Sequence, residues 1–172
     1  MNLKNMLFIL AFISLSCSSP NVDSFDVASP DESIHISFSL NSKGQPFYIV
    51  EFNNQKVIDT SYLGFEFIDK PPLGKDLEVT ISSTSESNET WQMPWGEQLN
   101  VVNHYNELKI ELKETTALNR KFNVIFRVYN DGLGFRYEFP EQQGWTEALI
   151  VDEHTEFNLT EDYKTFWTPG DW

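Results

Sequence analysis

The chain has 172 residues, the length of about one domain and enough to form a hydrophobic core without disulfides or metals. Aromatic residues make up 15% of it, and the hydrophobic fraction of 40% is ordinary for a globular protein. The formal net charge of −14 argues against a nucleic-acid partner, because phosphate backbones are bound by clustered Lys and Arg. A neutral ligand such as a sugar is compatible with it.

Residues 1–16 have the features of an export signal. Lys4 precedes an apolar run over residues 6–13, which is too short to span a bilayer. Small residues flank Cys17, the only cysteine, as at a bacterial lipoprotein processing site. We predict that Cys17 is the first mature residue and carries lipid, because an exported protein gains little from a lone thiol. Ser14 replaces the usual bulky aliphatic residue, so an ordinary signal peptide is the alternative.

This signal predicts an exported protein in the periplasm or on the outer membrane of a Gram-negative bacterium, with the lipid as its only membrane attachment. Residues 18–32 are rich in Ser, Pro, Asn and Asp, which predicts a flexible tether, and folding is expected to begin near Ser33.

Beyond the tether, apolar residues recur at every second position, the period of a half-buried strand. Polar turn clusters separate the predicted strands, which are residues 34–40, 46–52, 56–58, 63–68, 77–81 and 108–112. Residues 82–90 are polar throughout and are predicted to form an exposed loop. No window of twelve or more residues has a helical period, so the fold class is all-β, an antiparallel sandwich.

A tight hairpin is predicted over residues 121–139, where Asp131-Gly132 separates two alternating runs. With these as the loop residues, Val128 would face Phe135 and Arg127 would face Arg136. Two facing arginines are unfavourable unless an anion lies between them. A nearby structural Asp or Glu is the favoured anion, and a ligand carboxylate is the alternative that keeps both arginines as site candidates.

Three segments together resemble the N-terminal domain of glycoside hydrolase family 97, a family of bacterial exo-acting α-glycosidases. They are residues 91–97 followed by 102–108, residues 126–137, and residues 166–172. The resemblance implies an antiparallel β-super-sandwich of the galactose-mutarotase type, followed in the intact enzyme by a catalytic (β/α)₈ barrel and a small β domain. It also implies calcium-dependent hydrolysis of α-glucosides or α-galactosides.

The catalytic carboxylates and most calcium ligands of such enzymes lie on the barrel, and the ligand expected from the N-terminal domain would follow Trp172. The resemblance therefore assigns no catalytic or metal-binding residue to this chain, and it predicts that residues 33–172 are a C-terminally truncated, incomplete sandwich.

Several residues are candidates for binding sugar or for packing between domains. Trp91, Trp95 and Glu97 are the residue types of a sugar platform, in which aromatic faces meet a pyranose and a carboxylate binds its hydroxyls. Packing is the favoured role, because tryptophan is usually buried, although the turn at Trp95 suggests exposure. By the resemblance, Trp167, Asp171 and Trp172 should approach the barrel, where a domain interface is favoured over substrate contact.

Three functions follow from this sequence. The first is an accessory domain that packs on a catalytic barrel and shapes its oligosaccharide-binding pocket, without hydrolysing anything alone. The second is a lipid-anchored module that binds carbohydrate without cleaving it. The third is a structural sandwich of the cell envelope.

Overall fold

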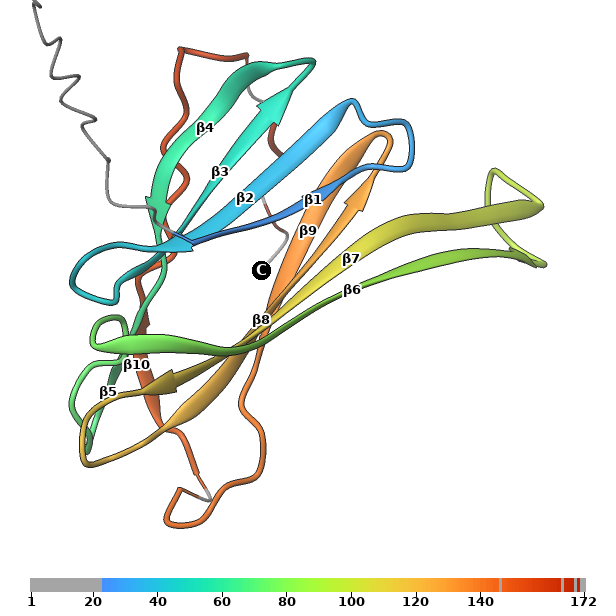
Figure 1. The fold of residues 1–172 in the computed structure, drawn as a ribbon. Coiled ribbons are helices and arrows are strands. Elements are labelled where there is room, and N and C mark those ends of the chain that lie inside the picture. Colours follow the sequence, from blue (N-terminus) through green and yellow to red (C-terminus); the bar gives the residue numbers. More distant parts are fainter. Residues whose placement is uncertain (1–22, 146, 165, 169, 171–172) are drawn as a thin grey trace, which may run out of the picture.

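The computed structural model describes residues 23–172 except residues 146, 165, 169, 171 and 172. The described part contains ten strands and no helix, and all of its strand pairs are antiparallel. Two four-stranded sheets face each other and a two-stranded sheet lies beside them (Figure 1). No membrane-spanning helix is found among the described residues. The all-β antiparallel sandwich predicted from sequence is confirmed.

The first sheet has the strand order β1-β2-β3-β4. Its strands are β1 (Ser24–Ala28), β2 (Ile34–Leu40), β3 (Pro46–Phe52) and β4 (Gln55–Tyr62). The prediction that residues 18–32 form a tether is wrong for β1, which pairs with β2 along its whole length. The segment forms a strand because Val27, two residues after Phe25, is buried in the core.

The second large sheet has the order β6-β7-β8-β9. Its strands are β6 (Leu77–Gln92), β7 (Asn100–Glu114), β8 (Lys121–Tyr129) and β9 (Gly132–Glu138). The prediction of a loop over residues 82–90 is wrong, because these residues continue β6 and pair with β7. Their side chains are almost all exposed, so the stretch lacks the apolar alternation that identifies a strand in sequence.

The small sheet pairs β5 (Phe65–Phe67) with β10 (Ile150–Glu153). After β10 the chain runs along the free edge of β4. There the Asp59 amide donates to the Asn158 carbonyl at 2.8 Å, and the Thr160 amide donates to the Val57 carbonyl at 3.2 Å. The edge that β4 would otherwise expose is thereby partly covered.

The core lies between the two large sheets. The inward-facing residues are apolar and nearly all fully buried, among them Ile36, Phe38, Tyr48, Leu108, Ile110, Leu112, Phe122, Val124, Phe126 and Val128. Their aromatic rings meet across the interface, with centroids 6.1 Å apart for Phe38 and Phe126 and 5.4 Å apart for Tyr48 and Phe135. This shared burial, rather than any single sheet, gives the sandwich its stability.

One ion pair is buried at the end of the sandwich. The Arg120 guanidinium donates to both carboxylate oxygens of Glu114, at 2.7 and 2.6 Å, and also to the carbonyls of Pro71 and Pro72. Both side chains of the pair are more than nine-tenths buried. Since Arg120 contacts both Glu114 at the end of β7 and the carbonyls of Pro71 and Pro72, this cluster holds the β7–β8 turn against the loop before β6.

The hairpin of β8 and β9 forms as predicted but in a different register. The two loop residues are Asn130 and Asp131, so that Val128 faces Leu133 and Arg127 faces Gly134. The predicted Asp-Gly loop, with Arg127 opposite Arg136, is therefore wrong. The Asn130 side chain accepts a hydrogen bond from the Asp31 amide at 3.1 Å, and this contact with a distant turn holds Asn130 in the loop.

Candidate functional site

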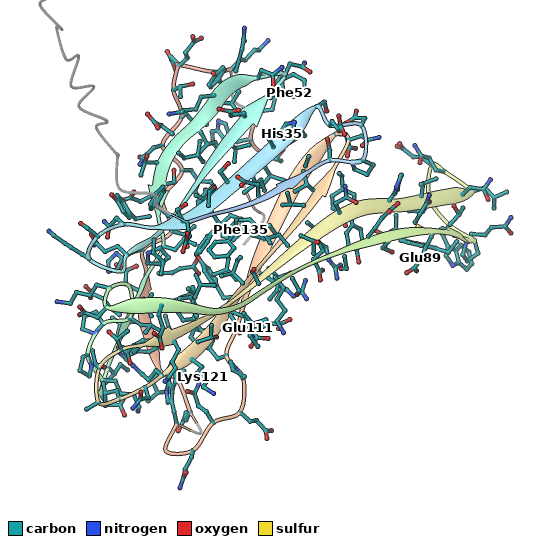
Figure 2. The ribbon with its side chains drawn as sticks, viewed as in Figure 1. His35, Phe52, Glu89, Glu111, Lys121 and Phe135 are labelled. Atoms are coloured by element: carbon teal, nitrogen blue, oxygen red, sulfur yellow. The ribbon has the colours of Figure 1, made fainter. Side chains whose placement is uncertain are left out.

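A two-stranded arm extends from the sandwich. It comprises residues 86–105, the part of the β6–β7 hairpin in which β7 has only β6 as a partner, because β8 pairs with β7 only as far as Asn106. Figure 1 shows the arm reaching well beyond the facing sheet, and in Figure 2 Glu89 lies far out on it while Phe135 lies between the sheets. At the base of the arm, Asn106 donates to the Ala28 carbonyl at 2.9 Å.

The two faces of the arm differ in character. On β7 the residues that enter the core are Leu108, Ile110 and Leu112, so odd-numbered residues lie on the outer face of the sheet. On that outer face Trp91 lies opposite Val101, and Tyr105 follows on the same face. The Met93 amide donates to the Leu99 carbonyl at 2.9 Å, which extends the same alternation to the tip.

The other face of the arm is polar except for Val102. His104 lies 3.3 Å from the Glu86 carboxylate, and Gln92 donates to Asn100 at 3.3 Å. The outer face carries five apolar or aromatic residues, which we call the outer apolar face: Trp91, Met93, Leu99, Val101 and Tyr105. Three polar residues, Ser87, Glu89 and Asn103, lie on the same side of the ribbon nearer its base. Trp91 is 45% exposed and Leu99 is 61% exposed, whereas Tyr105 is only 9% exposed, so the part of this face that is open to solvent lies toward the tip.

The turn at the tip of the arm carries two further predicted site residues. Trp95 is 81% exposed, and Glu97 is also exposed. The expected exposure of this turn is confirmed, and Trp91 does not lie in the sandwich core. The structure thus brings Trp91, Trp95 and Glu97 to one end of the molecule, on a surface rather than in a pocket.

The predicted arginines lie at the base of the arm, around one carboxylate. Arg127 donates to Glu107 at 2.7 Å, and Arg136 lies 3.9 Å from the same carboxylate oxygen. The hydrogen bond to Glu107 raises the pKa of Arg127. The acid expected between the two arginines is therefore Glu107, a structural residue of β7, and the alternative of a ligand carboxylate is not needed to explain their approach.

Aromatic rings join this charged cluster to the arm. The Arg127 guanidinium stacks 4.5 Å from the centroid of the Tyr105 ring, which lies 5.2 Å from the ring of Tyr129. Arg136, the second arginine near Glu107, also donates to Glu138 at 3.0 Å, and this contact lowers the pKa of Glu138. Tyr105, at the base of the arm, is thus covered by Arg127 and Tyr129.

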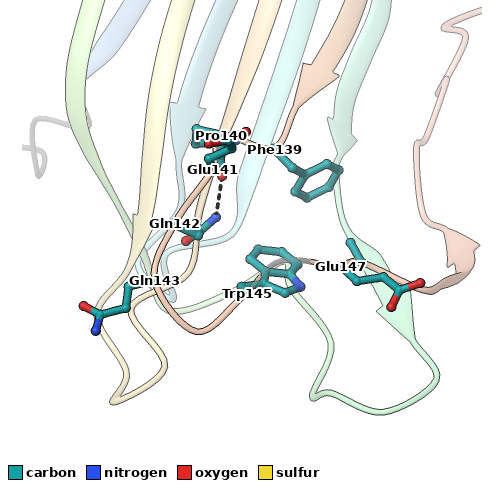
Figure 3. Close-up of a pocket in the computed structure, with 8 residues that line it drawn as sticks. Phe139, Pro140, Glu141, Gln142, Gln143, Trp145 and Glu147 are labelled. Carbon is teal, nitrogen blue, oxygen red and sulfur yellow. Dashed lines mark hydrogen bonds between the residues drawn. The ribbon is translucent and has the colours of Figure 1, made fainter.

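A cavity of about 620 Å³ lies at the opposite end of the sandwich, and none of the predicted site residues lines it. Figure 3 shows Trp145 within it, near Phe139 and Glu147. Trp145 is 8% exposed and packs against Phe67 and Phe139, and its indole N–H is buried with no hydrogen-bond partner among the described residues. The sequence offered only the glycine before Trp145 as a signal, which marks a turn and not a cavity.

The remaining predicted residues lie near the two ends of the chain. Trp167 is 78% exposed. Asp171, Trp172 and Cys17 lie outside the described residues. No group of three or more His, Cys, Asp or Glu side chains in the described part of the chain is placed to hold a metal ion.

The family model described as glycosyl-hydrolase 97 N-terminal matches residues 27–172, nearly all of the described chain. The chain belongs to this family. The membership agrees with the resemblance found in the sequence, and the match begins at Val27, inside β1 and within the segment predicted to be a tether.

Two solved structures have the same fold over most of this chain. An enzyme of the family from a Pseudoalteromonas species, in complex with panose, is 34% identical with a TM-score of 0.75, and the match covers 79% of this chain and 20% of that one. A β-arabinopyranosidase is 27% identical with a TM-score of 0.71, over 78% of this chain and 21% of that one.

A curated relative, the retaining α-galactosidase of Bacteroides thetaiotaomicron, is 22% identical over 160 residues, which are 93% of this chain and 22% of that protein. The chain therefore spans about a fifth of the length of the relatives it matches. Only the N-terminal domain of the family is represented in it.

Proposed function

We propose that this chain is the N-terminal accessory domain of an exo-acting α-glycosidase. In this function it packs on a catalytic barrel of the same polypeptide and shapes one wall of its oligosaccharide-binding pocket. The observation that supports the proposal most strongly is the family match over residues 27–172, together with relatives that are glycosidases about five times as long. The domain by itself is expected to hydrolyse nothing.

The substrate class is an α-glucoside or an α-galactoside. One relative is named a retaining α-galactosidase and another was solved with panose bound, so the relatives do not agree on one sugar. In this chain most acids of the described part lie on the surface, and the two that line the cavity beside Trp145, Glu141 and Glu147, are both exposed to solvent. The choice of substrate therefore belongs to the barrel.

The test begins with the reading frame downstream of residue 172. If it continues into a barrel, the longer protein should cleave p-nitrophenyl α-glucoside or α-galactoside, and the 172-residue chain should cleave neither. A stop codon directly after residue 172, with tight binding of maltose or galactosides by the chain, would replace the accessory domain with a free-standing carbohydrate-binding module.

Export and anchoring are part of the same proposal. The apolar run over residues 6–13 and the small residues around Cys17 support cleavage before Cys17 and attachment of lipid to its sulfur. The protein would then reside in the periplasm or on the outer membrane of a Gram-negative bacterium. Metabolic labelling with palmitate should mark the protein, and the Cys17→Ser variant should be unlabelled.

Calcium is proposed only for the longer enzyme. Among the described residues no group of three or more His, Cys, Asp or Glu side chains lies together. Chelation is therefore expected to lower the activity of the longer protein. It should leave the thermal unfolding of the 172-residue chain unchanged.

A further inference from the structure

The cavity beside Trp145 has the size and the lining of a site for a small ligand. Its volume of about 620 Å³ lies within the usual range for ligand pockets, about 300–1,000 Å³. Its wall combines apolar or aromatic side chains with carboxylates and an amide, which are Phe139, Pro140 and Trp145, and Glu141, Gln143 and Glu147. Aromatic rings beside a few polar groups are the usual lining of a small-molecule site.

The wall of this cavity is held in place by contacts within the domain. The Gln142 side chain pairs with the backbone of Lys121 as a neighbouring strand would, its amide donating to the Lys121 carbonyl and its oxygen accepting from the Lys121 N–H, both at 2.8 Å. Trp145 packs against Phe67 and Phe139, with ring centroids 5.5 Å away in both cases. A site with a fixed wall loses little conformational entropy when a ligand binds.

One polar group in this wall lacks a partner. Trp145 is more than nine-tenths buried, and its indole N–H has no hydrogen-bond partner among the described residues. Figure 3 shows the indole nitrogen on the side of the ring that faces Glu147. A buried donor without an acceptor is unfavourable, so an acceptor that enters the cavity would be stabilised there. Glu147 is exposed, and a change of its rotamer can open the way to the N–H.

A hydroxyl is the ligand group that matches this donor and its neighbour. The indole N–H can only donate and the ionised Glu147 carboxylate can only accept, so a group between them must accept from one and donate to the other. A hydroxyl does both, whereas an ammonium group cannot accept and a carboxylate cannot donate. Glu141 and Glu147 would also repel an anion. A neutral sugar, which has hydroxyls at its rim and an apolar ring face, therefore suits both parts of the wall.

A protein segment is a poorer occupant of this cavity than a sugar. Covering the cavity with protein would take Glu141 and Glu147 out of water, which is unfavourable unless each carboxylate gains a cationic partner or hydrogen bonds. A sugar supplies such hydrogen bonds through its hydroxyls and leaves the mouth of the cavity in water.

We propose that the cavity beside Trp145 binds one pyranose residue of a neutral oligosaccharide. The Trp145 N–H and the Glu147 carboxylate bind one hydroxyl of the sugar, and Phe139 and Pro140 contact its apolar face. This inference goes beyond the proposed function, which leaves the choice of sugar to the barrel, and it uses only residues of this domain.

NMR of the tryptophan indole groups tests the assignment in the 172-residue chain. Trp145→Phe keeps an aromatic ring and identifies the Trp145 indole signal by its loss. Maltose or methyl α-galactoside should shift that signal in a saturable way, and Glu147→Ala should raise the dissociation constant at least about tenfold, as expected for the loss of a hydrogen bond to a charged group. Glu97→Ala, at the exposed turn of the arm, is the matched control and should leave the dissociation constant unchanged.

Four results would overturn the proposal. The Trp145 signal could fail to shift with either sugar, or the Trp95 signal could shift in its place, which would move sugar binding to the arm. Tighter binding of glucosamine or glucuronate than of the neutral sugars would contradict recognition through a hydroxyl. A shift that occurs in the 172-residue chain and is lost in the longer protein would mean that another segment of the polypeptide fills the cavity. None of these results bears on the proposed function, which the activity of the longer protein decides.

Discussion

The core and the arm share two strands, β6 and β7, but are held together in different ways. Where β7 passes through the sandwich, Ile110 is fully buried between the two sheets, and eight residues earlier Val102 is 63% exposed on the same side of the strand. Both stretches have complete backbone pairing with β6. Backbone hydrogen bonds thus form the ribbon in both regions, but only the core adds the burial that makes a strand stable.

The largest difference in stability between core and arm is expected for a large side chain at the centre of the core. Phe126 is fully buried and meets Phe38, Tyr48 and Phe135 with ring centroids 5.4–6.1 Å away. We expect Phe126→Ala to lower the free energy of unfolding by about 3–5 kcal/mol, from lost burial and the cavity left behind. Urea denaturation measures it, with Phe52→Ala at a 47% exposed position as the control.

A loss near 1 kcal/mol in Phe126→Ala would mean that the two sheets do not share one core. It would remove the distinction between sandwich and arm on which the other predictions depend.

The second largest effect is expected at the buried ion pair. Glu114→Gln keeps the shape of the side chain but leaves the Arg120 guanidinium buried without its counter-charge, which should cost about 3 kcal/mol. Thermal unfolding measures it. The double variant Glu114→Leu with Arg120→Met should recover part of the loss, because two apolar side chains leave no uncompensated charge. If the double variant is as unstable as the single one, the carbonyls of Pro71 and Pro72 are the more important partners of Arg120.

The sequence predicts the core better than the arm for the same physical reason. Ile36, Phe38, Leu108 and Leu112 alternate with polar residues because one face of each strand is buried, and that alternation is visible without a structure. Residues 82–90 are solvated on both faces, so nothing in their side chains distinguishes a strand from a loop. The outer apolar face was partly visible as Trp91 and Trp95, but its members meet only through the pairing of β6 with β7.

Long-range contacts explain the other errors. The loop of the β8–β9 hairpin is set by the hydrogen bond between Asn130 and Asp31, a contact across 99 residues of sequence that no local turn rule contains. Burial of Trp145 depends likewise on Phe67 and Phe139, which belong to different elements. A shared acid near Arg127 could be predicted, but its identity as Glu107 required the register of β7 against β8.

A smaller effect is expected at Tyr48, where a core side chain reaches the edge of the sandwich. Its hydroxyl donates to the Glu156 carbonyl at 2.8 Å, so Tyr48→Phe should cost about 1 kcal/mol at neutral pH. Burial raises the pKa of Tyr48 from 10.0 to about 12. Between pH 10 and 12 the Tyr48 hydroxyl therefore stays protonated in the folded state but ionises in the unfolded chain. The stability gained from the protonated hydroxyl is complete below pH 10 and is lost as the pH rises toward 12.

The pH dependence of unfolding distinguishes the effect of the raised Tyr48 pKa from the effect of its hydrogen bond. Burial also raises the pKa of Tyr137, so alkali should still destabilise the Tyr48→Phe variant, but with a shallower slope between pH 10 and 12 than in the parent. Equal slopes would show that the Tyr48 hydroxyl is open to solvent.

The smallest effect is expected on the arm. Trp95 is 81% exposed, so Trp95→Ala should change the free energy of unfolding of the 172-residue chain by less than about 0.5 kcal/mol. Replacing a buried tryptophan would cost several times more. Hydrogen exchange should be faster for the amides of residues 86–92 than for those of residues 121–129, since the arm can open without disturbing the core. A destabilisation near 2 kcal/mol would mean that Trp95 packs on the sandwich, and the arm would then be part of the core.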